Sequence, residues 1–401
     1  MHCFRKVTED LYWVGANDRR LALFENFHPI PRGISYNSYL LLDEKTVLFD
    51  TADWAVCRQF LENVEAVLGG RKLDFLVLNH VEPDHSAALE EILLRWPGVK
   101  IIATAKAFEF LRQFGAETDG RADAVKEGDT RCFGRHTVTF LAAPMVHWPE
   151  VMVTFDTTNG VLFSADAFGT FAALDGKLFS DEMDFERDWL GEARRYYTNI
   201  VGKYGPQVQT LLKKVSKLDV KTICPLHGPV WRSNLDYFIG KYDLWSRYEP
   251  ESRGVLIVYG SMYGHTESAA EAIAAKLVED GVADVKLFDA SSTHVSYLIS
   301  ESFRLSHIVL ASVTYNLGIY PPMLGYLNDM KALNLQNRTF AVVENGTWAC
   351  TSGKLMSAFV TDEMKNCTLL GGKLSLKSSL GSERADDLDR FAAAVAESVK
   401  G

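Results

Sequence analysis

The chain has 401 residues, of which 47% are hydrophobic and 23% are charged, which is typical of a globular protein large enough for two domains. Its formal net charge is −10 and no stripe of Lys or Arg stands out, so we exclude nucleic acid and anionic membranes as expected partners. It has neither a run of about 18 apolar residues nor an N-terminal apolar core of signal-peptide length, so we expect a cytoplasmic protein without a membrane span.

The pattern of the first part of the chain predicts short strands joined by polar loops. Residues 11–15 form the first predicted strand, and residues 38–42 and 46–51 follow as a hairpin. Asp50 ends this hairpin, where it either supports a metal site or simply caps a turn. His28 is predicted in a preceding loop; a surface histidine is the simpler interpretation, and a proton donor above the site is the other.

A buried strand over residues 75–78 runs directly into a dense group of potential metal ligands. These ligands are His80, Glu82, Asp84 and His85. An apolar, helix-like stretch over residues 87–94 follows, so the pattern is strand, short loop, helix. Two imidazoles and two carboxylates in such a loop could seat two cations, whereas the alternative is a polar loop in which Asp84 caps the helix.

Three later strands each deliver one more potential ligand to a loop, which favours the metal interpretation. The strand over residues 137–143 precedes His147, a buried strand from residue 161 ends at Asp166, and residues 222–224 precede His227. A metal site on the rim of a sheet sandwich requires ligands from several strand ends, as here.

These motifs resemble the metallo-β-lactamase superfamily, which implies a four-layer αβ/βα sandwich for the N-terminal half. That superfamily opens its site with His-x-His-x-Asp-His, and here Glu82 replaces the second histidine. A carboxylate in place of an imidazole hardens the site and adds negative charge. Mixed His and carboxylate shells suit iron, whereas zinc has no redox chemistry, so the replacement favours electron transfer over hydrolysis.

The pattern changes near residue 250, so we predict domains over residues 1–250 and 251–401. A buried strand over residues 254–259 leads into a loop rich in Ser, Gly and Thr and then into an Ala-rich helix that ends at Glu279. Such a loop at a helix N-terminus can cradle a phosphate, although a plain helix cap is the alternative. Strands at 308–312 and 339–343, and a final helix from residue 383, complete five βα units of a doubly wound parallel sheet.

The second domain resembles flavodoxin and therefore implies FMN, because three strand ends supply a phosphate loop and two loops with aromatic residues. The predicted FMN contacts are Ser261, Met262, Tyr263, Gly264, His265, Thr266, Thr314, Tyr315, Asn316, Gly318, Asn345, Gly346, Thr347 and Trp348. Tyr263 stands where the family commonly has Thr. No Gly-x-Gly-x-x-Gly follows any strand, which disfavours a nicotinamide site.

The combination of both domains resembles the flavodiiron proteins, also called A-type flavoproteins. The resemblance implies that one iron takes His80, Glu82 and His147, that the other takes Asp84, His85 and His227, and that Asp166 bridges both. It also implies that Tyr197 lies beside the site, although a core-facing aromatic is the alternative.

The resemblance further implies an oxidoreductase that reduces dioxygen to water, nitric oxide to nitrous oxide, or both, with electrons from FMN. A head-to-tail homodimer, or a dimer of dimers, is expected to place the FMN of one subunit beside the irons of the other. The six cysteines include no Cys-x-x-Cys pair, so we expect a separate electron donor, with rubredoxin favoured and reduced deazaflavin as the alternative. A metal-dependent hydrolase with a fused flavin domain and a pure electron carrier remain the competing hypotheses.

Overall fold

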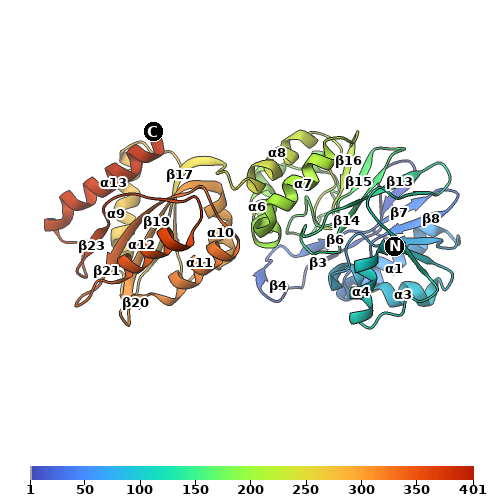
Figure 1. The fold of residues 1–401 in the computed structure, drawn as a ribbon, viewed down its shortest axis with the longest axis horizontal. Helices are drawn as coiled ribbons and strands as arrows, with labels where there is room; N and C mark the ends of the chain where they lie inside the picture. The colour runs from blue at the N-terminus through green and yellow to red at the C-terminus, as the bar shows by residue number, and fades with distance from the viewer. Residues whose placement is uncertain (1) are drawn as a thin grey trace. The chain divides into compact units, whose positions relative to one another are not determined.

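The computed structural model describes residues 2–401, which form two compact units that divide between Asp243 and Leu244 (Figure 1). This division lies in the last turns of α8 (Leu235–Ser246), slightly before the predicted boundary at residue 250. Residue 250 itself lies between α8 and β17 (Ser252–Gly260), where helix gives way to the next strand. Among the described residues, no helix has both the length and the apolar character needed to cross a bilayer.

The first unit contains a mixed sheet of seven strands that begins antiparallel and ends parallel. In spatial order its strands are β1 (Arg5–Lys6), β2 (Leu11–Trp13), β7 (Tyr39–Leu42), β8 (Thr46–Phe49), β9 (Phe75–Val77), β10 (Lys100–Thr104) and β11 (Ala122–Val125). Strands β8 and β9 are buried on both faces, as expected for strands inside a sandwich.

A second sheet of five strands packs against the first. Its strands are β12 (Thr130–Cys132), β13 (Thr137–Ala142), β14 (Met152–Asp156), β15 (Val161–Phe163) and β16 (Thr222–Cys224). The rings of Phe49 from the first sheet and Phe163 from the second stack with centroids 3.8 Å apart. Strand β14 was not predicted from the sequence; it is buried throughout and lies only a few residues after His147.

Helices cover the outer faces of both sheets and complete the predicted αβ/βα sandwich (Figure 1). Helices α1 (Cys57–Leu68), α3 (Leu89–Arg95) and α4 (Ala105–Gln113) accompany the first sheet, and α7 (Gly205–Val215) and α8 accompany the second. The stretch predicted as one helix over residues 87–94 is α3, preceded by the separate turn α2 (Pro83–Ser86). Proline is favoured in the first turn of a helix, and Pro83 occupies that position in α2.

The second unit is the predicted doubly wound parallel sheet. Its spatial order is β18 (Val285–Asp289), β17, β19 (Leu305–Tyr315), β21 (Thr339–Asn345) and β22 (Thr368–Leu369), with β23 (Leu374–Leu376) also pairing with β21. This order, 2-1-3-4-5 in chain sequence, is that of flavodoxin-like folds. Successive residues of β17 point to opposite faces: one face packs on α9 (His265–Glu279) and α13 (Ala385–Lys400), the other on α10 (Val295–Arg304) and α11 (Pro321–Ala332).

A fully buried arginine, Arg338, joins three segments of the second unit beneath this sheet. Its guanidinium donates to the carbonyl oxygens of Ser302 (2.8 Å), Phe303 (2.6 Å), Tyr248 (2.6 Å) and Gln336 (2.8 Å). Burial lowers the pKa of Arg338 to about 10, so the side chain remains charged at neutral pH. These carbonyls hold the end of α10, the approach to β21 and the chain before β17 together.

We expect Arg338→Met to lower the free energy of unfolding of the second unit by about 3 kcal/mol, because several buried carbonyls lose their donor at once. Urea denaturation of the full chain, followed by circular dichroism, measures this change. Arg390→Met, whose side chain is exposed, is the matched control and should leave the transition within about 0.5 kcal/mol of wild type. Equal effects of the two substitutions would contradict this role of Arg338.

Candidate metal centre and cofactor cleft

Seven side chains meet at one edge of the first unit, where several strands end. His80 and Glu82 follow β9, Asp84 and His85 lie in α2, and the remaining three come from loops after β13, β15 and β16. They form two groups, each with its potential ligand atoms within 4.8 Å of one another. The groups are His80, Glu82, His147 and Asp166, and Asp84, His85 and His227. The structure therefore brings together all seven ligands proposed from the sequence.

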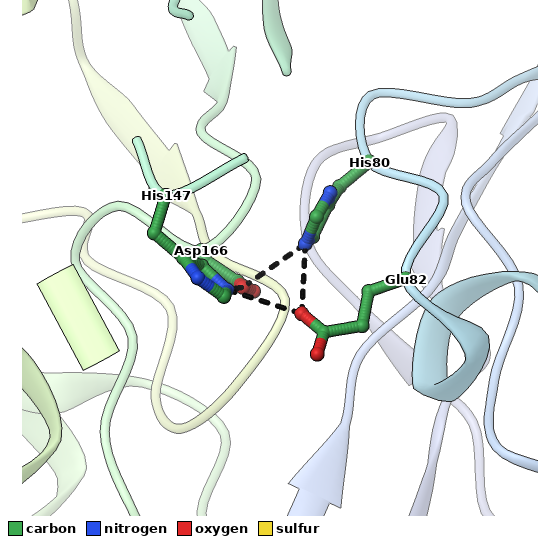
Figure 2. A group of neighbouring side chains, drawn as sticks. All are labelled: His80, Glu82, His147 and Asp166. Carbon is green, nitrogen blue, oxygen red and sulfur yellow. Dashed lines mark hydrogen bonds and ion pairs between the residues drawn. The ribbon is translucent and has the colours of Figure 1, made fainter. Parts of the chain in front are cut away.

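The first group surrounds one point between two imidazoles and two carboxylates (Figure 2). The Nε2 atoms of His80 and His147 each lie 3.1 Å from the Oε2 atom of Glu82. The Oδ2 atom of Asp166 lies 3.1 Å from Nε2 of His147 and 3.5 Å from Nε2 of His80. Atoms that each bind one cation at about 2.1 Å lie about 3 Å apart, so this spacing fits a shared ion.

The second group repeats this geometry with the other oxygen of the same aspartate. Nε2 of His85 lies 3.2 Å from Oδ2 of Asp84 and 3.2 Å from Oδ1 of Asp166. Nε2 of His227 lies 3.3 Å and 3.7 Å from the same two oxygens. Asp166 thus directs Oδ2 to the first group and Oδ1 to the second, which is the arrangement of a bridging carboxylate.

Several of the potential ligand atoms lack hydrogen-bond partners, which supports the interpretation that they bind metal. Within residues 2–401, both carboxylate oxygens of Asp84, Oδ1 of Asp166 and Nε2 of His85 and His227 are buried without a hydrogen-bond partner. Leaving a buried polar atom unpaired costs about 1–3 kcal/mol, so a cluster of such atoms indicates a site that binds a ligand. A His and carboxylate donor set of this kind fits iron.

The ionisation of the side chains in the first group also favours cation binding. Burial opposes ionisation of Glu82, but hydrogen bonds with His147 and His80 outweigh it and lower the Glu82 pKa to about 2. Burial likewise opposes protonation of His147, but Asp166 and Glu82 raise its pKa to about 9. His147 therefore holds a proton that balances the neighbouring carboxylates, and a bound cation would displace that proton.

Asp50, for which the sequence left two interpretations open, supports the ligand loop. Its buried carboxylate accepts hydrogen bonds from the backbone N–H (2.7 Å) and side-chain amide (2.7 Å) of Asn79, and from the N–H of His80 (3.2 Å). Burial raises the pKa of Asp50 to about 6, although these hydrogen bonds oppose the shift. The hydrogen bonds fix the backbone that presents His80.

A second supporting carboxylate, Glu150, was not recognised in the sequence. Its Oε1 atom accepts a hydrogen bond from Nδ1 of His80 at 2.6 Å, and the Glu150 side chain is fully buried. The available signal was its position three residues after His147, in a loop that had already been assigned a ligand. On the other side of the site, Nδ1 of His227 lies 2.7 Å from the carbonyl oxygen of Ser35.

The expectation that His28 lies on the surface was wrong. His28 is buried in the short strand β5 (His28–Pro29), which pairs with β4 (Leu23–Phe24). The hairpin folds inward because Phe24 packs on His227 with ring centroids 5.5 Å apart. Nε2 of His28 lies 3.7 Å from a carboxylate oxygen of Glu25, and a role of His28 in proton transfer remains a prediction.

The tyrosine beside the site is Tyr196, whereas the family resemblance implied Tyr197. The ring of Tyr196 lies 5.5 Å from that of His227, while Tyr197 packs on Tyr242 with ring centroids 4.9 Å apart. Successive residues of a helix point about 100° apart, so only one of two adjacent tyrosines can face the ligands. The Tyr196 hydroxyl is buried without a hydrogen-bond partner in the described part of the chain, and burial raises its pKa well above the usual value.

The second unit has a cleft of about 250 Å³ at the carboxyl ends of its strands. Eleven of the fourteen predicted FMN contacts line it, whereas Gly264, Tyr315 and Gly318 do not. The cleft also has lining residues that were not predicted: Val313, Leu317, Ala349 and Ser378. Tyr263 and Trp348 are 87% and 81% exposed, so their rings are available to a flat ligand. The cleft begins at the N-terminus of α9, which suits a phosphate.

Some predicted contacts hold the loops together. The side-chain amide of Asn345 donates to Oγ1 of Thr266 (3.3 Å) and the carbonyl of Ser378 (2.8 Å), and its Oδ1 accepts from the N–H of Ser378 (2.9 Å). Asn345 therefore joins three loops. Gly346 is required for the tight turn that follows, because a Cβ atom there would lie 1.8 Å from the carbonyl oxygen of Ala349.

Comparisons with known proteins agree with this division of the chain. Residues 34–228 match the family described as ODP family beta lactamase, and residues 257–382 match flavodoxin. An anaerobic nitric oxide reductase flavorubredoxin of Aeromonas hydrophila is 33% identical over 348 residues, which cover 85% of this chain and 70% of that protein.

Two solved structures are similar over nearly the whole chain. The rubredoxin oxygen:oxidoreductase of Desulfovibrio gigas has a TM-score of 0.90 and 29% identity, and the match covers 99% of this chain and 98% of that one. The flavodiiron protein of Giardia intestinalis has a TM-score of 0.91 and 25% identity, with the same coverage of both chains.

We expect Asp166→Asn to reduce the metal content from two ions to at most one, because the bridging negative charge is lost between two cations. Metal analysis of purified protein measures this change. Flavin content should remain at the wild-type value, because the cleft lies in the other unit. A variant that still holds two ions would contradict the bridging role of Asp166.

We expect Trp348→Ala to weaken FMN binding about tenfold, the effect of losing one ring-stacking contact. Titration of the apoprotein with FMN, followed by quenching of flavin fluorescence, measures the dissociation constant. Trp54→Ala, which removes a Trp that is 62% exposed in the first unit, should leave that constant unchanged. Equal affinities of wild type and Trp348→Ala would place the flavin ring elsewhere.

Proposed function

This chain belongs to the flavodiiron protein family, and we propose that it reduces dioxygen to water, nitric oxide to nitrous oxide, or both. The chain is an oxidoreductase, with FMN in its flavodoxin-like unit and a diiron centre in its lactamase-like unit. The observation that carries the proposal is the sharing of Asp166 between two groups that each contain two imidazoles and one further carboxylate.

Iron ions held by the two groups of ligands would supply electrons and Lewis-acid activation for the reduction of a small diatomic molecule. The protein's own contribution is to fix the ligands and to balance their charge. Glu82, Asp84 and Asp166 provide three negative charges next to four imidazoles, which favours the more highly charged oxidised state of the site. A hydrolase of this fold would need no such redox balance.

Aromatic rings surround the ligands and limit the access of water. The ring centroids of Tyr36 and His227 lie 5.6 Å apart, and those of Trp148 and His80 lie 5.4 Å apart. Such an apolar wall admits an uncharged gas more readily than a charged solute and strengthens electrostatic interactions inside the site. Burial raises the pKa of Tyr196 further above neutral pH, so its hydroxyl keeps its proton and can donate a hydrogen bond at the site.

We also propose that electrons come from a separate donor in the cytoplasm: the protein rubredoxin is the first candidate, and the soluble cofactor reduced deazaflavin is the second. The similar protein of Desulfovibrio gigas is named rubredoxin oxygen:oxidoreductase, and this name supports rubredoxin as the first candidate. A head-to-tail homodimer, or a dimer of such dimers, would bring the FMN of one subunit to the irons of another. The high exposure of Tyr263 and Trp348 at the cleft supports a partner surface there.

The decisive experiment follows consumption of dioxygen and of nitric oxide separately, by electrode, with reduced rubredoxin as donor. Dioxygen uptake without peroxide release would identify a four-electron oxygen reductase, and nitric oxide loss with appearance of nitrous oxide would identify a nitric oxide reductase. The Asp166→Asn protein is the control and should consume neither gas. Failure to consume either gas with full iron and FMN, even with chemically reduced flavin as donor, would refute the proposal.

Metal analysis separates this proposal from the hydrolase alternative. We expect iron in protein purified from cells grown without added zinc, and we expect the apoprotein reloaded with iron to regain gas consumption. Zinc in the native protein, together with no gas consumption after iron loading, would favour the hydrolase.

A further inference from the structure

The two groups of metal ligands are equivalent in donor type. Each supplies two imidazoles and one carboxylate of its own, and Asp166 contributes one oxygen to each. The directly coordinating residues therefore give no reason for the two ions to differ. Any difference in affinity or redox behaviour has to come from the groups that contact the ligands.

The groups behind the ligands are not equivalent. On the first side, Oε1 of Glu150 lies 2.6 Å from Nδ1 of His80 and also accepts the N–H of Val81 at 3.2 Å. On the second side, Nδ1 of His227 lies against the neutral carbonyl of Ser35, and Nδ1 of His85 has no hydrogen-bond partner within residues 2–401. Only the first group therefore has a carboxylate bonded to the far nitrogen of a histidine ligand.

Among the residues that the structure describes, the charge of Glu150 depends on one partner, His80, for its compensation. The side chain is fully buried, and its Oε2 atom has no hydrogen-bond partner in the described part of the chain. His80 is its single ion-pair partner among residues 2–401. A buried carboxylate is costly unless a positive charge lies close by, and a cation on Nε2 of His80 would supply that charge through the imidazole ring.

We propose that Glu150 is a positioning residue that makes the two metal positions unequal, so that the ion held by His80, Glu82 and His147 binds more tightly and is oxidised first. The inference rests on the proposed diiron function of this site. The hydrogen bond fixes the His80 tautomer with Nε2 toward the metal, and the carboxylate makes the imidazole a stronger donor. Stronger donation and a nearby negative charge both favour the ion of higher charge.

The competing explanation is that Glu150 only joins two loops. It lies three residues after His147 and bonds to the loop of His80, so its removal could loosen both ligands without any electrostatic effect. The experiment must therefore separate the charge of Glu150 from its packing. Glu150→Gln keeps the size and an acceptor oxygen but removes the charge, and Glu150→Asp keeps the charge on a shorter side chain.

The fold offers a matched control in the same unit. Asp156 is a buried carboxylate whose Oδ2 atom lies 2.8 Å from Nδ1 of His136, a histidine outside both ligand groups. Asp156→Asn therefore removes the charge of a buried carboxylate that contacts a histidine, as Glu150 contacts His80. His136, however, is not one of the metal ligands. Far-UV circular dichroism and FMN content verify that each variant is folded.

The test titrates the apoprotein with ferrous iron alone, anaerobically, against a competing chelator, and resolves two binding steps. We expect Glu150→Gln to weaken one step by about 10- to 100-fold and to leave the other unchanged, while Asp156→Asn changes neither. Glu150→Asp should retain most of the wild-type affinity. In a redox titration followed by electron paramagnetic resonance, Glu150→Gln should raise the potential at which the mixed-valent signal appears.

Equal weakening of both steps, unchanged affinities in Glu150→Gln, or equal losses in the Gln and Asp variants would each overturn the inference. If Glu150→Gln does not fold, a wild-type affinity order in Glu150→Asp supports the inference and an altered order overturns it. If wild type binds two ferrous ions and Glu150→Gln has no effect, the unequal affinity of the two metal positions is refuted but the diiron centre is not. Fewer than two ions in wild type would refute the diiron centre as well.

Discussion

The position of Asp166 between four imidazoles is the constraint on which the first unit depends. Its carboxylate is buried and its two oxygens face different pairs of histidines, so the charge is tolerated only if positive charge lies on both sides. The surrounding fold meets this requirement by ending several strands at one edge of the sandwich. The stacked rings of Phe49 and Phe163 are one of the contacts through which the two sheets that carry these loops pack together.

Spacing along the chain was sufficient to predict four of the seven candidate ligands but not the support that Glu150 gives to His80. His80, Glu82, Asp84 and His85 lie within six residues, and local density of this kind is visible in a sequence. Glu150 supports His80 from a residue 70 positions away, and no local pattern connects the two. Likewise, the sequence Tyr196-Tyr197 cannot reveal which ring faces the site, because that depends on how the helix is rotated against the core.

The second unit was more predictable because its strands and loops alternate regularly. Every residue of the phosphate loop from Ser261 to Thr266 except Gly264 lines the cleft, as expected for a loop between a buried strand and a helix. Ser378 was missed because its contribution depends on Asn345, which joins it to the other loops through three-dimensional contacts. The parallel pairing of the sheet followed from the βα repeat, whereas the split of its last edge into β22 and β23 did not.

The single turn α2 has a consequence for how this protein can change over evolutionary time. Glu82 precedes Pro83 and contacts the first ligand group, while Asp84 and His85 follow it directly and belong to the second. Four consecutive residues therefore supply ligands to both groups. Insertion or deletion of one residue here would rotate one ligand pair away from its ion, so homologous sequences should vary in the identity of neighbouring residues but keep the length of this segment invariant.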